Sequence, residues 1–249
     1  MNAATRSPQP PLTRSVEDYL KSVFHLTSQG GFATTSDIAE MLAVAPPSVS
    51  GMMKRLSETG LIEHVPYRGV QLTHQGRRAA LQMIRRHRIL ESYLTSKLGY
   101  DWGDVHVEAE RLEHAVSEKL IERMADALGE PRYDPHGAPI PTREGTLDTP
   151  ALVPLADVTV GEVVRIRQVG DKDPERLRYL AELGVTPGAD VRVVARAPFG
   201  GPITLRIVRK GREGLRMAGR GLGAADRERA IGPALAAQIF VEIHRKHEA

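Results

Sequence analysis

The stretch VAPPSVSGMMKRLSETGLIEHVPYRGVQLT, residues 44–73, decides how the first part of this chain folds. Pro47 suits the first turn of a helix and Gly60 suits the position just after its end. We therefore expect a helix over residues 47–59. Residues 36–43, just before this stretch, have the apolar spacing of another short helix. Two short helices joined by a tight turn indicate a helix-turn-helix.

Two short strands should follow these helices. Residues 61–65 and 70–73 have strand character, and Gly69 suits the turn between them. A helix-turn-helix followed by a two-stranded hairpin is typical of a winged helix. Upstream, residues 15–26 have apolar positions at helical spacing and should form a supporting helix. Residues 1–13 are polar and Pro-rich and should be disordered at the start.

The second helix of the pair would read double-stranded DNA. Pro47, Ser48 and Ser50 lie in its first turns, where helix N-termini attract phosphate. Lys54 lies one turn further along, and Arg68 lies at the wing tip. The opposite face should pack on the core through Val49, Met53 and Leu56. Winged helices also serve as protein-interaction modules, so the shape by itself leaves that alternative open.

Composition narrows the class of protein further. The chain has 249 residues, a net charge of +3, a pI of about 9.3 and no cysteine. Disulfides, iron–sulfur clusters and thiolate zinc sites are therefore excluded, and a metal would need nitrogen and oxygen ligands. No apolar run approaches the length of a membrane span, so we expect no membrane partner and a cytoplasmic protein. Basic residues gather in residues 77–88, which suits nucleic acid or a solvated helix face.

A possible metal site lies in HVEAERLEHAVSEK, residues 106–119. On one continuous helix, which we expect from about residue 105 to 128, His106, Glu110, Glu113 and His114 would share one face. A solvated helix would more often alternate Glu with Lys or Arg. His and Glu side chains converging on one face are typical metal ligands, although an i,i+3 carboxylate pair is weak evidence in isolation.

A second expected helix, over residues 75–98, carries His87 and Glu91 on one face. Together with His106 they could form one nitrogen and oxygen site. In the first helix, Asp18 offers a carboxylate that could join Glu110, Glu113 and His114 in another site.

Residues 129–150 are rich in Pro and Gly and should be a linker. Beyond them several short alternating runs predict a small β-barrel, with a helical piece at residues 179–184 and a loop at 219–223. The chain is thus expected to be an α+β protein with domains 1–75, 76–148 and 149–249.

Five segments together resemble the diphtheria-toxin-repressor family of metal-dependent transcriptional repressors, including its manganese-responsive branch. The segments are EDYL (17–20), SDIAE (36–40), PSVS (47–50), RHRILE (86–91) and ERLEH (110–114). RYLAELGVTPG (178–188) and APFGGPI (197–203) are similar to the SH3-like domain of that family, of the iron-transport accessory type. The resemblance implies a winged helix, a helical metal-binding and dimerisation domain, and an SH3-like barrel.

The resemblance also implies two ligand sets. The primary set would be Asp18, Glu110, Glu113 and His114. The ancillary set would be His87, Glu91 and His106, completed by a carboxylate of the third domain, for which Asp173 is the first choice and Glu175 the second. Position 110 is Cys in the iron-responsive branch and Glu here. Lys21 stands where the manganese branch commonly has another Glu, so a second metal cannot be bound in quite that branch's way.

The function that follows is a dimeric repressor of metal-uptake genes, activated by Mn²⁺ or Fe²⁺ and bound to a pseudo-palindromic DNA operator. Dimerisation is expected through apolar residues after Trp102, namely Leu112, Val116, Leu120, Ile121 and Met124. The alternatives are an iron-dependent regulator of the same family and a metal-independent winged-helix regulator. A metallohydrolase lacks an H-E-x-x-H motif and a nucleophile-and-base arrangement here, so no enzyme activity is expected.

Overall fold

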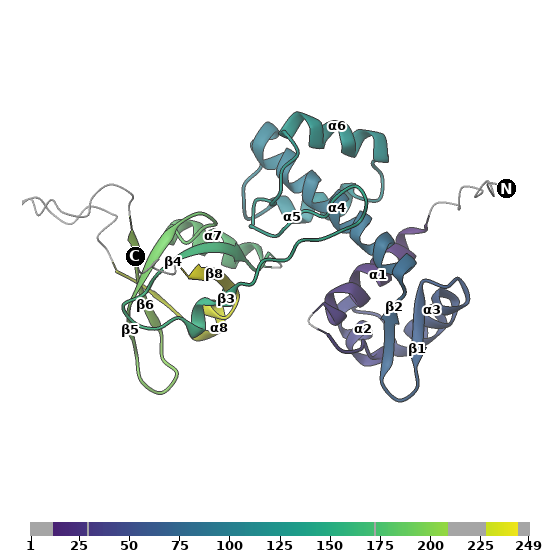
Figure 1. Ribbon diagram of the computed structural model, residues 1–249, viewed down its shortest axis with the longest axis horizontal. Coiled ribbons are helices and arrows are strands. Elements are labelled where there is room, and N and C mark those ends of the chain that lie inside the picture. The colour runs from purple at the N-terminus through teal and green to yellow at the C-terminus, as the bar shows by residue number, and fades with distance from the viewer. Residues whose placement is uncertain (1–11, 29, 172, 209–227, 244–249) are drawn as a thin grey trace, which may run out of the picture. The chain divides into compact units, whose positions relative to one another are not determined.

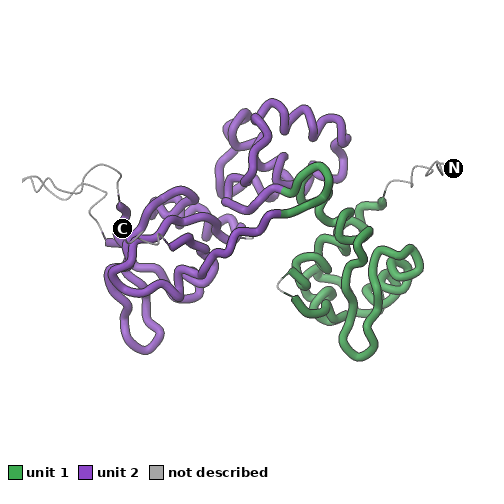
Figure 2. Tube along the Cα trace, viewed as in Figure 1, with its two compact units in different colours: residues 1–86, 141–147 green, residues 87–140, 148–249 purple. Residues whose placement is uncertain are grey.

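The computed structural model describes residues 12–28, 30–171, 173–208 and 228–243. The described chain forms two compact units, coloured separately in Figure 2. The first contains residues up to 86 together with 141–147, and the second contains residues 87–140 and 148 onward. One long helix, α4 (His74–Leu98), contributes residues to both units. The expected loop at 219–223 lies outside the described residues. Within them, no helix is both long enough and apolar enough to cross a membrane.

The first unit is a winged helix, as the sequence predicts (Figure 1). Its first two helices begin at residues whose side chains satisfy free N–H groups: the Thr13 hydroxyl accepts from Val16, and Thr34 and Asp37 form a capping box. The third helix has no side-chain cap but begins with proline. The elements are α1 (Arg14–Thr27), α2 (Thr35–Leu42), α3 (Pro46–Glu58), β1 (Ile62–Val65) and β2 (Gly69–Leu72).

The wing, which is the hairpin of β1 and β2, is hydrogen-bonded to the segment just before α2. β1 and β2 pair antiparallel, and Val70 also forms an isolated antiparallel bridge with Ala33. Gly69 makes that approach possible, since a Cβ atom there would lie 2.4 Å from the Ala33 carbonyl oxygen. The Gln71 side chain also donates a hydrogen bond to the carbonyl oxygen of Gly31 at 2.8 Å. The wing is therefore held along one edge.

The single helix expected over residues 105–128 is in fact two helices, α5 (Val105–Leu112) and α6 (Glu118–Leu128). Glu113 is the C-cap of α5. Ser117 has extended backbone and its hydroxyl accepts from the N–H of Leu120, so a new helix starts there. The prediction of one face through residue 114 is wrong for this reason: Glu113 and His114 lie in the turn, not on the helix.

The segment expected to be a linker, residues 129–150, packs closely in its first half. Ala138 and Ile140 are buried, and Tyr133 and Pro139 form an antiparallel bridge. The Asp134 carboxylate accepts hydrogen bonds from the N–H groups of His136 and Ala138, at 2.8 and 2.9 Å. These hydrogen bonds close a tight turn beside α4, so the Pro and Gly content reflects turns and not a free linker.

The C-terminal part is an antiparallel sheet of six strands in the order β3-β8-β4-β5-β6-β7. Its strands are β3 (Val153–Pro154), β4 (Val163–Val169), β5 (Asp190–Arg196), β6 (Ile203–Val208), β7 (Glu228–Ile231) and β8 (Ile239–Ile243). The helical elements are η1 (Leu155–Asp157), α7 (Pro174–Leu183) and α8 (Pro233–Ala236). The helix expected at 179–184 therefore begins earlier, at Pro174, because Asp173 caps it.

Three separate hydrophobic clusters underlie these parts, one in the winged helix, one among α4, α5 and α6, and one in the sheet. Three clusters agree in number with the three expected domains. The exact boundaries stay a prediction, because α4 belongs to two of the clusters.

Candidate metal centre and nucleic-acid interface

The centre of the ligand cluster is Glu91 on α4, whose side chain is fully buried. One of its oxygens, Oε1, lies 3.0 Å from Nε2 of His87 and 2.9 Å from Nδ1 of His106. His87 stands one turn earlier on α4, whereas α5 supplies His106. The structure therefore brings the i,i+4 pair His87 and Glu91 together with His106, the three residues expected in the ancillary set.

Glu113 continues the cluster toward the end of α5. Its carboxylate is fully buried, with Oε2 2.7 Å from Nδ1 of His87 and Oε1 3.3 Å from Nε2 of His114. Glu110 lies at the more open side, with Oε1 3.8 Å from Nδ1 of His87. Within the second unit, the helix break after Leu112 thus turns Glu113 inward beside His114, whereas Glu110 lies in a cluster with His87 and His106, two residues expected in the ancillary set.

The third-domain carboxylate near the cluster is Asp171. One ligand atom each from Glu91, His106 and Asp171 lie within 4.8 Å of one another. The two expected residues are placed differently, because Asp173 caps α7 and pairs with Arg176 at 2.8 Å. Glu175 lies in the first turn of that helix, and neither residue belongs to a ligand cluster within the described ranges.

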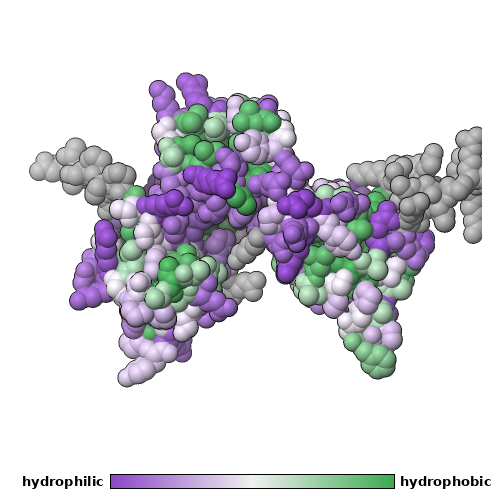
Figure 3. Space-filling model, turned by 180° about the vertical axis from the view of Figure 1, so that it is seen from behind, coloured by the Kyte–Doolittle hydropathy of each residue, from purple (hydrophilic) through white to green (hydrophobic). Residues whose placement is uncertain are grey.

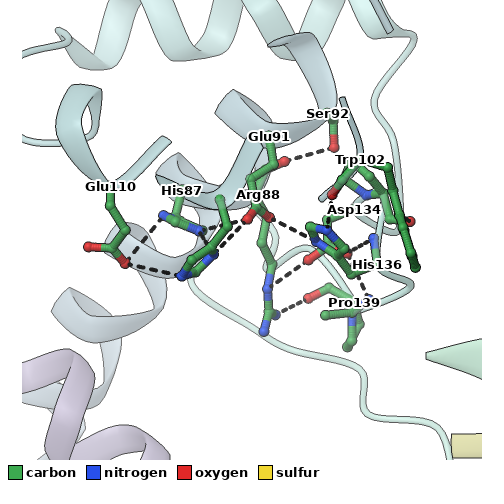
Figure 4. A network of polar contacts seen from close by, with 12 residues as sticks. His87, Arg88, Glu91, Ser92, Trp102, Glu110, Asp134, His136 and Pro139 are labelled. Atoms are coloured by element: carbon green, nitrogen blue, oxygen red, sulfur yellow. Dashed lines mark hydrogen bonds and ion pairs between the residues drawn. The ribbon is translucent and has the colours of Figure 1, made fainter. Parts of the chain in front are cut away.

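Two further candidate ligands, Asp134 and His136, were missed by the sequence reasoning. One ligand atom each from Glu91, Asp134 and His136 lie within 4.8 Å of one another, and all three side chains are buried. Figure 4 shows Glu91 between the His87 side of the cluster and the His136 side. These two residues form an Asp-x-His motif in a Pro- and Gly-rich stretch. Its only sequence signal for a metal site is that both residues are of types that bind metals.

The cluster of Glu91, Asp134 and His136, here called the inner cluster, contains buried polar atoms without hydrogen bonds to the described residues. Oε2 of Glu91, Oδ2 of Asp134 and Nδ1 of His136 are buried without a hydrogen-bond partner in the described part of the chain. The Glu91 and His136 atoms are 3.8 Å apart, and Oδ2 of Asp134 lies 3.4 Å from Nε of Arg88. Buried polar atoms without partners are costly. Two carboxylates and an imidazole with ligand atoms within 4.8 Å of one another are donor types that suit a divalent cation of hard or borderline character.

Close packing of ionisable side chains shifts the pKa values of Glu91, Asp134 and His136. Burial would raise the pKa of Glu91, but the surrounding imidazoles His106, His136 and His87 hold it well below its usual range. Burial would lower the pKa of His136, yet the Glu91 carboxylate outweighs this and raises it to about 9. Burial and the nearby Glu91 charge raise the pKa of Asp134 to about 6. Glu91 therefore stays ionised, and His136 is protonated near neutral pH. A cation bound by His136 would replace that proton.

Asp18, the fourth expected primary ligand, lies on α1 and is half-buried. It belongs to the first unit, whereas Glu110, Glu113 and His114 belong to the second. Its place beside them therefore stays a prediction.

On α3, Pro47, Ser48, Ser50 and Lys54 are exposed. Val49, Met53 and Leu56 are buried, which confirms the predicted orientation of this helix. The Ser50 hydroxyl donates to the Pro46 carbonyl oxygen at 3.3 Å. Arg68, at the wing tip, lies over the Phe32 ring, 5.5 Å from its centroid.

Comparison with known proteins finds three family models along the chain. Residues 11–70 match the iron dependent repressor N-terminal DNA binding domain, and residues 73–142 match the iron dependent repressor metal binding and dimerisation domain. Residues 153–243 match the FeoA domain. The three matches follow one another in the order expected from the resemblance.

Individual relatives agree with the family models. The chain is 32% identical to the iron-dependent repressor IdeR of Mycobacterium tuberculosis, over 79% of this chain and 90% of that protein. It is 36% identical to the HTH-type transcriptional regulator MntR of Lysinibacillus sphaericus, over 47% of this chain and 83% of the relative. A solved manganese-dependent transcriptional repressor in complex with manganese is 36% identical, with a TM-score of 0.79, covering 92% of this chain and 99% of the other.

Proposed function

The chain belongs to the diphtheria-toxin-repressor family of metal-dependent transcriptional repressors, and on that premise we propose that Mn²⁺, with Fe²⁺ as a substitute, switches it on. It is a DNA-binding, metal-responsive repressor that acts as a homodimer. We propose further that its operator is a pseudo-palindrome, that it controls metal-uptake genes, and that it works in the cytoplasm without enzymatic activity.

The observation that carries this proposal is the buried ligand cluster around Glu91, which is made of imidazoles and carboxylates without any sulfur. We propose that the second metal site is built on Glu91, with His87 and His106 on one side and Asp134 and His136 on the other. Asp171 would close this site from the sheet domain. Three unsatisfied buried atoms support the inner half of this assignment.

For the first site we keep the ligand set implied by the family, namely Asp18, Glu110, Glu113 and His114. A divalent cation supplies the positive charge that lets three carboxylates gather there. Without it, like-charge repulsion would oppose bringing the Asp18 carboxylate to Glu110 and Glu113. Asp18 belongs to the first unit, which contains the winged helix, and the other three residues belong to the unit that contains α5. A cation bound by all four would therefore restrain the winged helix relative to the second unit.

Manganese is favoured by the donor atoms. Three of the four first-site ligands are carboxylates, and hard oxygen donors suit Mn²⁺. Glu110, where the iron-responsive branch has Cys, favours the same metal. An iron-dependent regulator is the second candidate, because a relative that is 32% identical over 79% of this chain is named an iron-dependent repressor. A metal-independent regulator is less favoured, because ion pairs at 3.8 Å for Glu91 with His136 and 3.4 Å for Asp134 with Arg88 leave these buried atoms without a hydrogen bond in the described part of the chain.

The test is metal-dependent selection of DNA. The purified full chain is mixed with a pool of random duplexes, with Mn²⁺ or with EDTA, and retained DNA is sequenced. We expect one two-fold-symmetric motif with Mn²⁺ and none with EDTA. The same motif selected equally well in EDTA would overturn metal dependence. No motif under either condition would overturn the proposal as a whole.

A further inference from the structure

The wing turn contains a side chain that the fold does not explain. Tyr67 lies between β1 and β2 and is fully exposed, at 107% of its reference accessibility. Its backbone is left-handed, with φ of 64°. Glycine and asparagine adopt that conformation more readily than tyrosine, and the apolar part of the tyrosine ring gains no burial when it is fully exposed to solvent. Neither local geometry nor packing therefore accounts for an aromatic residue here.

The backbone around Tyr67 is nevertheless well defined. The N–H of Arg68 donates to the carbonyl oxygen of Val65 at 3.0 Å and closes the turn. The wing is tied to the body through the Val70–Ala33 bridge and the close approach of Gly69. The Arg68 guanidinium lies over the Phe32 ring. Tyr67 is thus a solvent-exposed aromatic side chain on a hairpin whose backbone is held by hydrogen bonds to its own turn and to Ala33.

The wing also borders a groove against the recognition helix. A cavity of about 380 Å³ lies between them, lined among others by Ser50, Lys54 and Ser57 of α3 and by His64 of β1. Glu58 is one opposing charge on its rim. Its cationic, hydroxyl and imidazole lining suits a sugar–phosphate strand. A strand that passes between α3 and the wing separates the major groove, which α3 would enter, from the adjacent minor groove.

We propose that Tyr67 enters the minor groove flanking each half-site and reads it. The proposal rests on the DNA-reading function proposed above and adds a second reading element to it. The minor groove is about 6 Å wide, which admits a phenyl ring edge-on between the apolar sugar walls. The phenol can donate to the N3 and O2 acceptors of A·T pairs, whereas the N2 amino group of guanine would obstruct it. Tyr67 should therefore prefer flanks without that amino group.

The chain offers a matched control in Phe199. It is also a fully exposed aromatic residue, at 104%, with a left-handed φ of 59°, and it lies between β5 and β6 in the other unit. Figure 3 shows the tip of that hairpin as a hydrophobic projection of the sheet domain. Asparagine tolerates the left-handed conformation, so Tyr67→Asn and Phe199→Asn each remove a ring without adding strain.

The experiment uses the duplex selected by the Mn²⁺-loaded parent, with flanking pairs changed to A·T, G·C or inosine·C. Inosine keeps the major-groove face of guanine but lacks the N2 amino group. We expect the parent to bind A·T and inosine·C flanks about tenfold more tightly than G·C flanks. Tyr67→Asn should bind all three flanks with the same, weaker affinity, and Phe199→Asn should behave as the parent.

Two results would overturn the proposal. One is a Tyr67→Asn variant with parental affinity and parental flank preference. The other is a parent that prefers A·T over G·C but treats inosine·C like G·C, since the major groove would then be the source of the preference. Either result leaves metal-dependent selection of the motif intact, so failure at Tyr67 is distinguishable from failure of the proposed function.

Discussion

Nδ1 of His87 lies 2.7 Å from Oε2 of Glu113, which joins the middle of α4 to the end of α5. The other oxygen of Glu113 lies 3.3 Å from Nε2 of His114. Glu113 thus faces ligands of both proposed metal sites. A carboxylate that binds a cation gives up negative charge to it and accepts hydrogen bonds from neighbouring imidazoles more weakly, so we expect occupation of one site to alter the other.

The first prediction concerns the link between metal and DNA. Asp18→Asn should leave the fold and the dimer intact but abolish Mn²⁺-stimulated binding, because the reading unit loses its charged ligand. Fluorescence anisotropy with labelled operator measures binding, and circular dichroism and sedimentation check structure. Glu40→Gln, an exposed carboxylate on α2, is the control. Normal activation of Asp18→Asn would refute this coupling mechanism.

The second prediction concerns the identity of the metal. Zn²⁺ generally binds nitrogen and oxygen sites more tightly than Mn²⁺, but its tetrahedral preference need not recruit Asp18. Mn²⁺ should therefore activate DNA binding fully, Fe²⁺ nearly so, and Zn²⁺ less despite tighter binding. Calorimetry gives metal affinity and anisotropy gives activation across one titration. Equal maximal activation by Zn²⁺ and Mn²⁺ would contradict the geometric argument.

The third prediction concerns pH. The pKa of His136 is raised from 6.5 to about 9 in the folded, metal-free protein. A raised pKa means that the folded state holds the proton more tightly, so this stabilisation is complete below about pH 6.5 and is lost as pH rises through about 9. Urea unfolding in EDTA at a series of pH values should show that the free energy of unfolding falls as pH rises. In the His136→Gln variant this fall should be smaller. His64→Gln, in the exposed part of β1, should leave it unchanged.

Metal binding at the same site should release that proton, because a ligating imidazole must be neutral. Calorimetry of Mn²⁺ binding at neutral pH, in buffers of different ionisation enthalpy, measures the release. His136→Gln should lower both the proton release and the number of bound Mn²⁺ ions. Unchanged stoichiometry in that variant would remove His136 from the second site.

The fourth prediction concerns the dimer. Of the apolar residues expected at the interface, Ile121 is fully buried in its own protomer, whereas Leu120 on α6 is 44% exposed. Leu120→Glu should weaken the dimer at least about tenfold, since an unpaired charge would be buried on association. Val160→Glu, at a site 48% exposed in the sheet domain, is the control. Sedimentation of a stable Leu120→Glu dimer at parental concentration would place the interface elsewhere.

The fifth prediction concerns DNA contacts. Lys54→Ala and Arg68→Ala should weaken binding to most sequences alike and flatten the salt dependence by about 0.9 per lost phosphate contact. Ser48→Ala should instead change sequence preference, because we expect the exposed Ser48 side chain to reach base edges. Binding of all three variants across a salt series tests this. Parental behaviour in all three would show that another surface reads DNA.

Local sequence was enough to predict the winged helix and the pairing of His87 with Glu91 on one helical face. Caps and breakers such as Thr34, Pro47 and Gly60 act within one turn of themselves, so their effect can be read without tertiary structure. The i,i+4 spacing of His87 and Glu91 likewise places both side chains on one helical face, whatever packs against it.

Only the tertiary structure decided what surrounds Glu91. Asp134 and His136 come from a stretch whose composition indicates a linker, and Asp171 comes from the sheet domain. Their proximity to Glu91 arises from the packing of segments about forty and eighty residues away, for which no local periodicity exists. The break between α5 and α6 has a similar origin, because burying Glu113 against His87 adds to what the weak local signal of Ser117 provides.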